Sequence, residues 1–390
     1  MIGNMRIKVY PRRDSVFRFG IRNKVIVVSV GASANHAVRQ IARRTGSAAL
    51  VHDKGTDGEL GEDAEITKRT IINTVLNPNV YGALLVGLGD ERYNANDIAS
   101  ELERFKHVSW LHVQEIGERT TITKGVRLIK ELKKEAAESS TRQSKDISGL
   151  TVGVKCGASD YTSVFANAVV GLLVDRVVSM GGRIVFTETP ELIGMESHLY
   201  RRCISRGTAK KLKAVIQENI RGILSYSRSW IGAQPNYGNI RGGITTIEEK
   251  SAGAVLKTGT SKIIDVLRYG ERIERREPGV YFVDGPGFDV PAITALAASG
   301  CHAKIFTTGS GEPIGSPVSP TIKVTANNKT YNIMRDNMDL DLSPALSGVQ
   351  LNELAEKLFI LLKETVNGRL TAAERAAHED FAILKNGPTL

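Results

Sequence analysis

The residues best suited to chemistry stand where apolar runs of the chain end. Lys155, Ser159 and Asp160 follow a run that begins at Leu150, in a turn of small residues that reads KCGASD. A lysine among small residues at the end of a strand can be desolvated and lose its proton near neutral pH, so Lys155 is a candidate base or carboxylate-binding group. The competing interpretation is an ordinary lysine in a solvent-exposed loop.

A second polar turn carries two carboxylates. It reads TETPE, includes Glu188 and Glu191, and follows the apolar run at 183–186. Several carboxylates on one loop suit acid–base catalysis or a hard divalent cation with oxygen ligands. The same letters resemble the start of a helix with proline at its first position. Both interpretations stay open at this point.

One histidine has the residue type and the neighbours of a metal ligand. His52 ends an apolar run and is followed closely by Asp53 and Asp57. Imidazole and carboxylate groups bind several divalent metals. A single histidine at the end of a strand is also often structural, so this pattern alone does not decide the role.

Two glycine-rich turns also follow apolar runs. They read GLGDER at 87–92 and TGSGEPIG at 308–315. Neither completes the G-x-G-x-x-G pattern that opens a helix in dinucleotide-binding folds. The glycines either satisfy tight turns or let the turn amides bind an anion such as a carboxylate or phosphate.

Strands and helices that alternate along the chain must position these turns. Apolar runs at 24–33, 47–53, 81–91 and 108–115 are each followed by a segment with helical periodicity, and the alternation pauses at 136–148 before it resumes. Such alternation predicts parallel sheets with ligands at the carboxyl ends of the strands. We expect an α/β protein with two doubly wound (Rossmann-like) parallel-sheet domains, residues 1–145 and 146–390, a linker at 136–148 and a surface tail at 369–390.

Composition narrows the class of protein. The 390 residues carry a formal net charge of +10, but no block of five or six like charges occurs. We therefore expect a pocket for a small anionic metabolite and no nucleic-acid partner. The three scattered cysteines exclude a disulfide framework, and no apolar run suits a signal peptide or a membrane span. The expected location is cytoplasmic.

Several long motifs resemble one known family. NPNVYGALLVGLGDE, VKCGASDYTSVFANAVVG, TETPELIGME, GNIRGGITTIEEKSAGAVLKTGT, VDGPGFD, FTTGSGEPIGSPVSPTIKVTAN and DNMDL resemble, in this order, the altronate/galactarate dehydratase family, which includes the large subunit of sulfolactate sulfo-lyase. The resemblance covers roughly residues 12–345. It implies a metal-dependent elimination of water, or of sulfite, from a hydroxy acid to give a 2-keto acid.

The matched motifs imply roles for individual residues. The candidate base or carboxylate-binding groups are Lys155 and Lys323, and the candidate acid–base groups or metal ligands are Asp160, Glu188 and Glu191. The residues expected to bind and orient the substrate are Ser159, Asn239, Arg241, Thr245, Thr308 and Gly309.

The chain also departs from the family pattern. Cysteines of the family are replaced in the segments VGASAN, HDKGTDG and GLGDE, so we do not expect an iron–sulfur centre. The replacement would be an oxygen-rich site for Mg, Mn or Fe formed by His52, Asp57, Asp90 and Glu91, or no metal at all. The small β-rich domain of longer members is missing, which implies a separate small subunit or loss of that role.

Other classes of function stay open beside a homo-oligomeric lyase. One is a nucleotide- or phosphate-binding protein that uses the glycine-rich strand ends. Another is an inactive paralogue that serves as a partner subunit, which the replaced cysteines make plausible.

Overall fold

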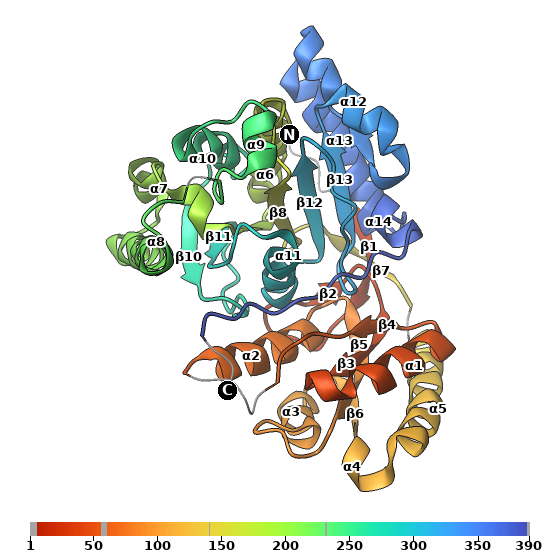
Figure 1. Cartoon of the computed structure of the whole chain (residues 1–390). Coiled ribbons are helices and arrows are strands. Elements are labelled where there is room, and N and C mark those ends of the chain that lie inside the picture. The colour runs from red at the N-terminus through yellow and green to blue at the C-terminus, as the bar shows by residue number, and fades with distance from the viewer. Residues whose placement is uncertain (1–5, 56–60, 140, 231, 388–390) are drawn as a thin grey trace.

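Two parallel β-sheets organise the molecule (Figure 1). The computed structural model describes residues 6–55, 61–139, 141–230 and 232–387. Both sheets arise from the alternation of strands and helices that the sequence predicts, so the α/β class with parallel sheets is confirmed.

The first sheet has four parallel strands in the order β4 (Ala48–Leu50), β3 (Lys24–Ser29), β5 (Val80–Gly87) and β6 (His107–His112). Side chains alternate along each strand, so both faces of this sheet are apolar. Helices α1 (Asn35–Thr45) and α5 (Glu118–Glu138) pack on one face, and α2 (Asp63–Val75) and α3 (Ala95–Leu102) pack on the other.

The second sheet has seven parallel strands with β8 (Thr151–Gly157) near its centre. Its order is β10 (Ile263–Leu267), β11 (Gly279–Val283), β9 (Arg183–Phe186), β8, β12 (Ala303–Thr308), β13 (Thr321–Thr325) and β14 (Leu340–Asp341). Helices α6 (Ser163–Ser179) and α13 (Leu351–Val366) cover one face. Helix α11 (Asp289–Ala298) covers the other.

The remaining elements connect these layers. They are β1 (Arg6–Pro11), β2 (Phe19–Gly20), β7 (Gln143–Asp146), η1 (Ala32–Ala34), α4 (Val113–Ile116), η2 (Thr189–Leu192), α7 (Glu196–Arg202), α8 (Arg206–Tyr226), α9 (Tyr237–Arg241), α10 (Ile247–Leu256), α12 (Asn328–Ile333), η3 (Arg335–Asn337), η4 (Ser343–Ser347) and α14 (Ala372–Arg375). Among the described helices, none combines the length and the apolar character needed to cross a membrane.

The segment 136–148 is more ordered than the expected linker. It begins with the last turn of α5 and contains strand β7, which pairs antiparallel with β1. The two large sheets also share apolar contacts, because α11 of the second packs against α2 of the first. The structure therefore joins the two halves of the chain through packing as well as through this segment.

The expectation of a surface tail at 369–390 is correct only in part, because some of its described residues are buried. Ala372, Ala373 and Ile383 are buried. The chain here runs back between the two sheets (dark blue in Figure 1), and the backbone amides of Asn386 and Gly387 donate to the Asp63 carboxylate of α2. Apolar residues spaced too irregularly to show a helical or strand period carry this return path, which is why the sequence pattern did not reveal it.

Candidate functional site

Two candidate lysines lie on the two strands of the second sheet that flank β12. Lys155 of β8 pairs in register with Phe306 of β12, which pairs with Lys323 of β13. Their neighbours in sequence pack against α6 and α13, so this row of side chains faces α11. Two strand spacings, roughly 10 Å, separate the two lysine backbones.

Lys155 is the centre of a buried network of charges. Its Nζ lies 2.7 Å from Glu188 Oε1 and 2.5 Å from Asp289 Oδ1, and it also donates to the carbonyl oxygen of Cys156. Burial alone would lower the pKa of Lys155, but the two carboxylates outweigh it and raise the pKa above its ordinary value. Lys155 is therefore a fixed ammonium group at neutral pH and not a free base.

Glu188 lies opposite Lys155 in a strained backbone conformation. Its φ is 78°, in the left-handed region that non-glycine residues rarely adopt. The carboxylate accepts from the Cys156 amide at 3.3 Å and lies 2.8 Å from Lys257 Nζ. Burial and the charge of Glu191 raise the pKa of Glu188, while the ammonium groups of Lys155 and Lys257 act in the opposite direction.

The turn that holds Glu188 is both a helix start and a pair of carboxylates, the two interpretations that the sequence left open. Residues 189–192 form the short 3-10 helix η2, with Pro190 at its start. The helix directs Glu191 back toward the end of β8, where its carboxylate accepts from the Cys156 thiol at 3.2 Å. A helix start and a pair of convergent carboxylates are therefore the same feature.

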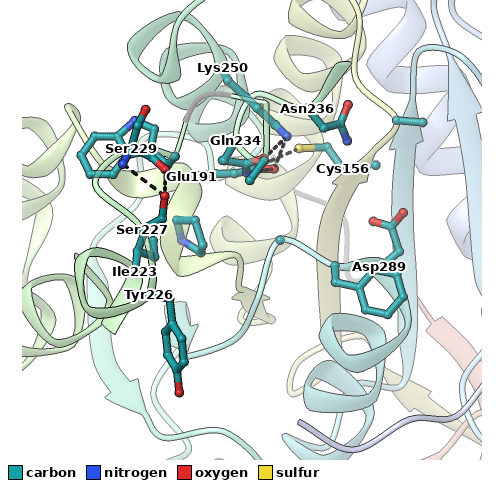
Figure 2. Close-up of a pocket in the computed structure, with 17 residues that line it drawn as sticks. Cys156, Glu191, Ile223, Tyr226, Ser227, Ser229, Gln234, Asn236, Lys250 and Asp289 are labelled. Atoms are coloured by element: carbon teal, nitrogen blue, oxygen red, sulfur yellow. Dashed lines mark hydrogen bonds and ion pairs between the residues drawn. The ribbon is translucent and has the colours of Figure 1, made fainter. Parts of the chain in front are cut away.

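Lys250 holds the second carboxylate, as Figure 2 shows. Its Nζ lies 3.2 Å from Glu191 Oε1 and donates to Gln234 Oε1 and Asn239 Oδ1 at 2.7 and 2.9 Å. Burial would raise the pKa of Glu191, but Lys250 and Lys257 together lower it to about 2. Glu191 is a carboxylate at any physiological pH.

Sequence reasoning missed Lys250, Lys257 and Asp289 as site residues. The first two are seven positions apart, which places them two turns apart on one face of α10 and its C-terminal cap. Asp289 begins α11, directly after the strand-end motif VDGPGF. Helical spacing within EEKSAGAVLKTGT was the signal that could have found the two lysines.

A cavity of about 680 Å³ opens beside this network. Cys156, Glu191, Lys250 and Asp289 form part of its wall. The opposite wall comes from the end of α8 and the loop after it, with the side chains Ile223, Tyr226, Ser227 and Ser229 (Figure 2). Trp230 also lines the cavity. The cavity therefore combines charged groups with a wall of aromatic and hydroxyl side chains, a surface suited to a small polar acid.

Lys323 differs from the other lysines because its amine has no hydrogen-bond partner among the described residues. Burial lowers the pKa of Lys323 to about 8, although Asp339, Asp380 and Glu312 act in the opposite direction. Burial and the negative charge of Asp289 raise the pKa of the Glu312 carboxyl group. The charges of both Asp289 and Lys323 therefore act on Glu312.

Asp160, Ser159 and Asn239 hold loops together. Asp160 Oδ1 accepts from the amide and hydroxyl of Thr162, and Oδ2 accepts from Asn327 Nδ2 at 2.7 Å. Asn239 donates to the Ser159 carbonyl oxygen at 2.9 Å. Both oxygens of Asp160 are therefore engaged within the protein, at the start of α6.

The other candidate substrate-binding residues are spread over different surroundings. Arg241 is exposed, and Thr245 is exposed with its amide and hydroxyl bound to Glu249 Oε2. Thr308 is buried and accepts from the Gly311 amide at 3.0 Å. Gly309 is buried against Asp160.

Replacing Gly309 by alanine is expected to destabilise the fold by about 1–3 kcal/mol. A Cβ at Gly309 would lie 2.4 Å from the Asp160 carboxylate, which Thr162 and Asn327 hold in place. Gly222→Ala is the matched control, because a Cβ there meets nothing within 4 Å. Chemical denaturation of both variants measures the difference, and equal stability of the two would contradict this packing.

Two family models match the chain. One, described as "D-galactarate/Altronate dehydratase, C-terminal", covers residues 147–389 and includes the whole network around Lys155. The other, described as "D-galactarate dehydratase/Altronate hydrolase, second domain", covers residues 9–137. The chain belongs to the D-galactarate/altronate dehydratase family.

Curated relatives of this family are similar over most of the chain. An altronate dehydratase of Bacillus subtilis is 33% identical over 95% of this chain and 76% of its own length. An altronate dehydratase of Escherichia coli is 32% identical over 98% of this chain and 78% of its own length. The (2R)-sulfolactate sulfo-lyase subunit beta of Chromohalobacter salexigens is 35% identical over 96% of each chain.

The candidate metal ligands of the first sheet do not converge on one point in this family member. Both ring nitrogens of His52 are hydrogen bonded to the backbone of Ser29 and Lys54. Both oxygens of Glu91 accept from amides of its own turn, and Asp90 accepts from Gln114 at the surface. Asp57 lies outside the described residues. The backbone thus uses the groups that a metal would need.

A different set of ligand types does converge. Among the described residues, Cys156, Glu188 and Glu191 form the one group of three whose ligand atoms lie within 4.8 Å of one another. Three ammonium groups, those of Lys155, Lys250 and Lys257, already neutralise the carboxylates. Burial and both glutamates raise the pKa of the Cys156 thiol to about 12. As these residues lie, they do not fit a divalent cation.

Proposed function

We propose that the chain is a hydro-lyase that removes water from a small polyhydroxy acid and releases a 2-keto acid. The observation that carries the proposal is the cavity at the carboxyl end of β8. Asp289 lines this cavity and forms an ion pair with the buried Lys155. Dehydratase relatives that align over nearly the whole chain support the same reaction class.

The reaction needs a base, a charged environment for the enediolate and a proton for the leaving group. In our proposal, Lys323 removes the proton from the carbon next to the carboxylate, because its amine has no hydrogen-bond partner among the described residues and burial lowers its pKa to about 8. The C–H electron pair enters the enediolate and then forms the C=C bond of an enol as the C–O bond on the neighbouring carbon breaks, and the hydroxyl takes up a proton and leaves as water. Tautomerisation of the enol gives the 2-keto acid.

The other site residues position these groups. Lys155 holds Asp289 and Glu188, and its charge stabilises negative charge that develops at the cavity wall. In our proposal, Glu312 supplies a proton to the leaving hydroxyl, because it is half-buried and burial raises its pKa. Lys250 and the loop residue Gln234 fix Glu191 at the opposite edge. None of these steps uses a metal ion.

Elimination of sulfite is the second candidate. It is supported by the (2R)-sulfolactate sulfo-lyase subunit beta, whose 35% identity to this chain is close to that of the altronate dehydratases. The name of that relative also suggests a separate small subunit for this chain. A homo-oligomeric, cytoplasmic enzyme with a small anionic substrate and no nucleic-acid partner completes the proposal.

The purified full chain tests the proposal in one assay. Aldonates, aldarates and sulfolactate are incubated separately, and 2-keto acid and sulfite are measured in each. We expect 2-keto acid without sulfite from at least one sugar acid. Sulfite release from sulfolactate alone would replace the hydro-lyase by a sulfo-lyase, and no product from any acid would favour the inactive partner subunit. Thermal stabilisation by a nucleotide, with none by the acids, would favour a nucleotide-binding protein.

A further inference from the structure

Lys257 touches every member of the group that has the ligand types of a metal site. Its Nζ lies 2.8 Å from Glu188 Oε2, 3.1 Å from Cys156 Sγ and 4.0 Å from Glu191 Oε2. Those three residues are the group whose ligand atoms lie within 4.8 Å of one another. The ammonium nitrogen therefore shares one small polar space with one ligand atom from each of them.

The fold leaves Lys257 no alternative position. Its side chain is 2% exposed, and the residue is the C-terminal cap of α10, whose buried face packs on α6 and η2. Lys250, on the same face, binds Glu191 from the other side. The helix thus delivers one ammonium group to each side of the Glu191 carboxylate.

The balance of charges, like the contacts of Lys257, disfavours a divalent cation in this network. The buried network contains three lysines, Lys155, Lys250 and Lys257, and three carboxylates, Glu188, Glu191 and Asp289. A divalent cation added to this balanced set would leave two unpaired positive charges in the protein interior, which is strongly unfavourable. Removal of Lys257 would leave one unpaired negative charge among ligand atoms of the right type.

We propose that the ammonium group of Lys257 is a built-in cation that occupies the centre of a latent metal site. It contacts Cys156, Glu188 and Glu191 where a divalent ion would, its charge offsets that of the two carboxylates, and it excludes such an ion from them. This inference concerns binding and is independent of whether the chain is a lyase.

The exchange of lysine for metal is balanced in charge. In a chain without the Lys257 ammonium, a divalent ion would bind the Cys156 sulfur and one oxygen each of Glu188 and Glu191. The Cys156 thiol would release one proton to solvent on ligation. The ion and the thiolate together then carry one positive charge, the charge that the ammonium and the thiol carry in the natural chain. No redox step is involved.

The decisive variant is Lys257→Ala, studied in the full chain after chelation and desalting. We expect it to bind about one equivalent of Co²⁺ or Zn²⁺ at least 100-fold more tightly than the natural chain does. Co²⁺ should also give the absorption bands of a cobalt–thiolate bond. Those bands should vanish in Lys257→Ala/Cys156→Ser. Calorimetry and absorption spectroscopy measure the two effects without any activity assay.

Two further variants serve as controls. Lys257→Met removes the charge but fills the space, so its gain in metal affinity should be smaller than that of Lys257→Ala. Lys250→Ala removes an ammonium group that contacts only Glu191 among the three ligands, and should produce no cobalt–thiolate bands. A folded Lys257→Ala variant with no more affinity for metal than the natural chain would overturn the proposal.

The natural chain provides a test that does not depend on the folding of any Lys257 variant. Purified from cells supplied with zinc, iron and manganese, it should contain no metal that the Cys156→Ser substitution removes. A stoichiometric metal that is lost in Cys156→Ser would show that Lys257 does not occupy the site, and would overturn the proposal.

Discussion

Replacing Lys155 by methionine is expected to lower kcat by about 100- to 1000-fold. The ammonium group of Lys155 holds Asp289 on the wall of the cavity at 2.5 Å and Glu188 beneath it at 2.7 Å. Without it, Asp289 is free to turn away and two negative charges lose a buried partner. Steady-state kinetics with the acid identified in the product assay measures the loss, and KM should change less than kcat.

The same substitution also threatens the fold, so a matched variant separates the two effects. Loss of one member of a buried ion pair destabilises proteins by about 3–5 kcal/mol. Lys155→Met/Glu188→Gln removes the opposing charge as well, and should recover much of the stability while kcat stays low. Recovery of kcat together with stability would mean that Lys155 acts only as a structural residue.

Replacing Lys323 by methionine is expected to lower kcat/KM by about 100- to 10,000-fold, the usual contribution of a general base. A base must be unprotonated, and the pKa of Lys323 is lowered to about 8 by burial. The natural chain should therefore gain activity as pH rises toward 8 and level off above it. Lys323→Met should lose this rising limb together with the activity.

The free energy of unfolding should also depend on pH through the Lys323 amine. The folded pKa of Lys323 is about 8, below the value of about 10.4 for a lysine in an unfolded chain. Between these two values the unfolded chain binds one proton more than the folded chain, so the free energy of unfolding rises with pH. Lys323→Met should remove that part of the rise in denaturation measured from pH 7 to 10.5.

An exposed lysine is the control for both measurements. The side chain of Lys211 is 60% exposed and pairs with Asp265 at the surface, far along the sheet on β10. Lys211→Met should leave the pH profile of kcat/KM unchanged. If Lys323→Met kept the rising limb, the base would be another group, and Asp289 on the cavity wall would be the next residue to replace.

The strands and helices were open to prediction because each has a local cause. β-branched runs that end in small polar residues mark buried parallel strands, and helical periodicity marks the segments between them. The pairing of β1 with β7 was not open to prediction, because residues 6–11 and 143–146 are short and far apart in sequence. The return path of the tail was missed because its apolar residues follow no regular period and its hydrogen bonds to Asp63 of α2 are long-range.

Some residues of the candidate site could be predicted from local sequence, and others depend on how distant helices pack. Lys155, Glu188 and Glu191 were open to prediction because Lys155 lies near the end of β8 and the two glutamates follow β9, and parallel strands bring those ends to one edge of a sheet. Asp289 and Lys257 come from helices more than sixty residues away, and their contribution depends on how α10 and α11 pack. His52 and Glu91 have the residue types of ligands, but local backbone amides and carbonyls engage them.

The sequence by itself determined the family, the α/β class and the strand ends that carry Lys155 and Glu188. Those properties depend on residue type and short-range spacing, which a chain displays before it folds. Only the tertiary structure decided the charge state and the partner of each group. A lysine becomes a fixed ammonium at Lys155 and a candidate base at Lys323 because two carboxylates face the first and no hydrogen-bond acceptor among the described residues faces the second.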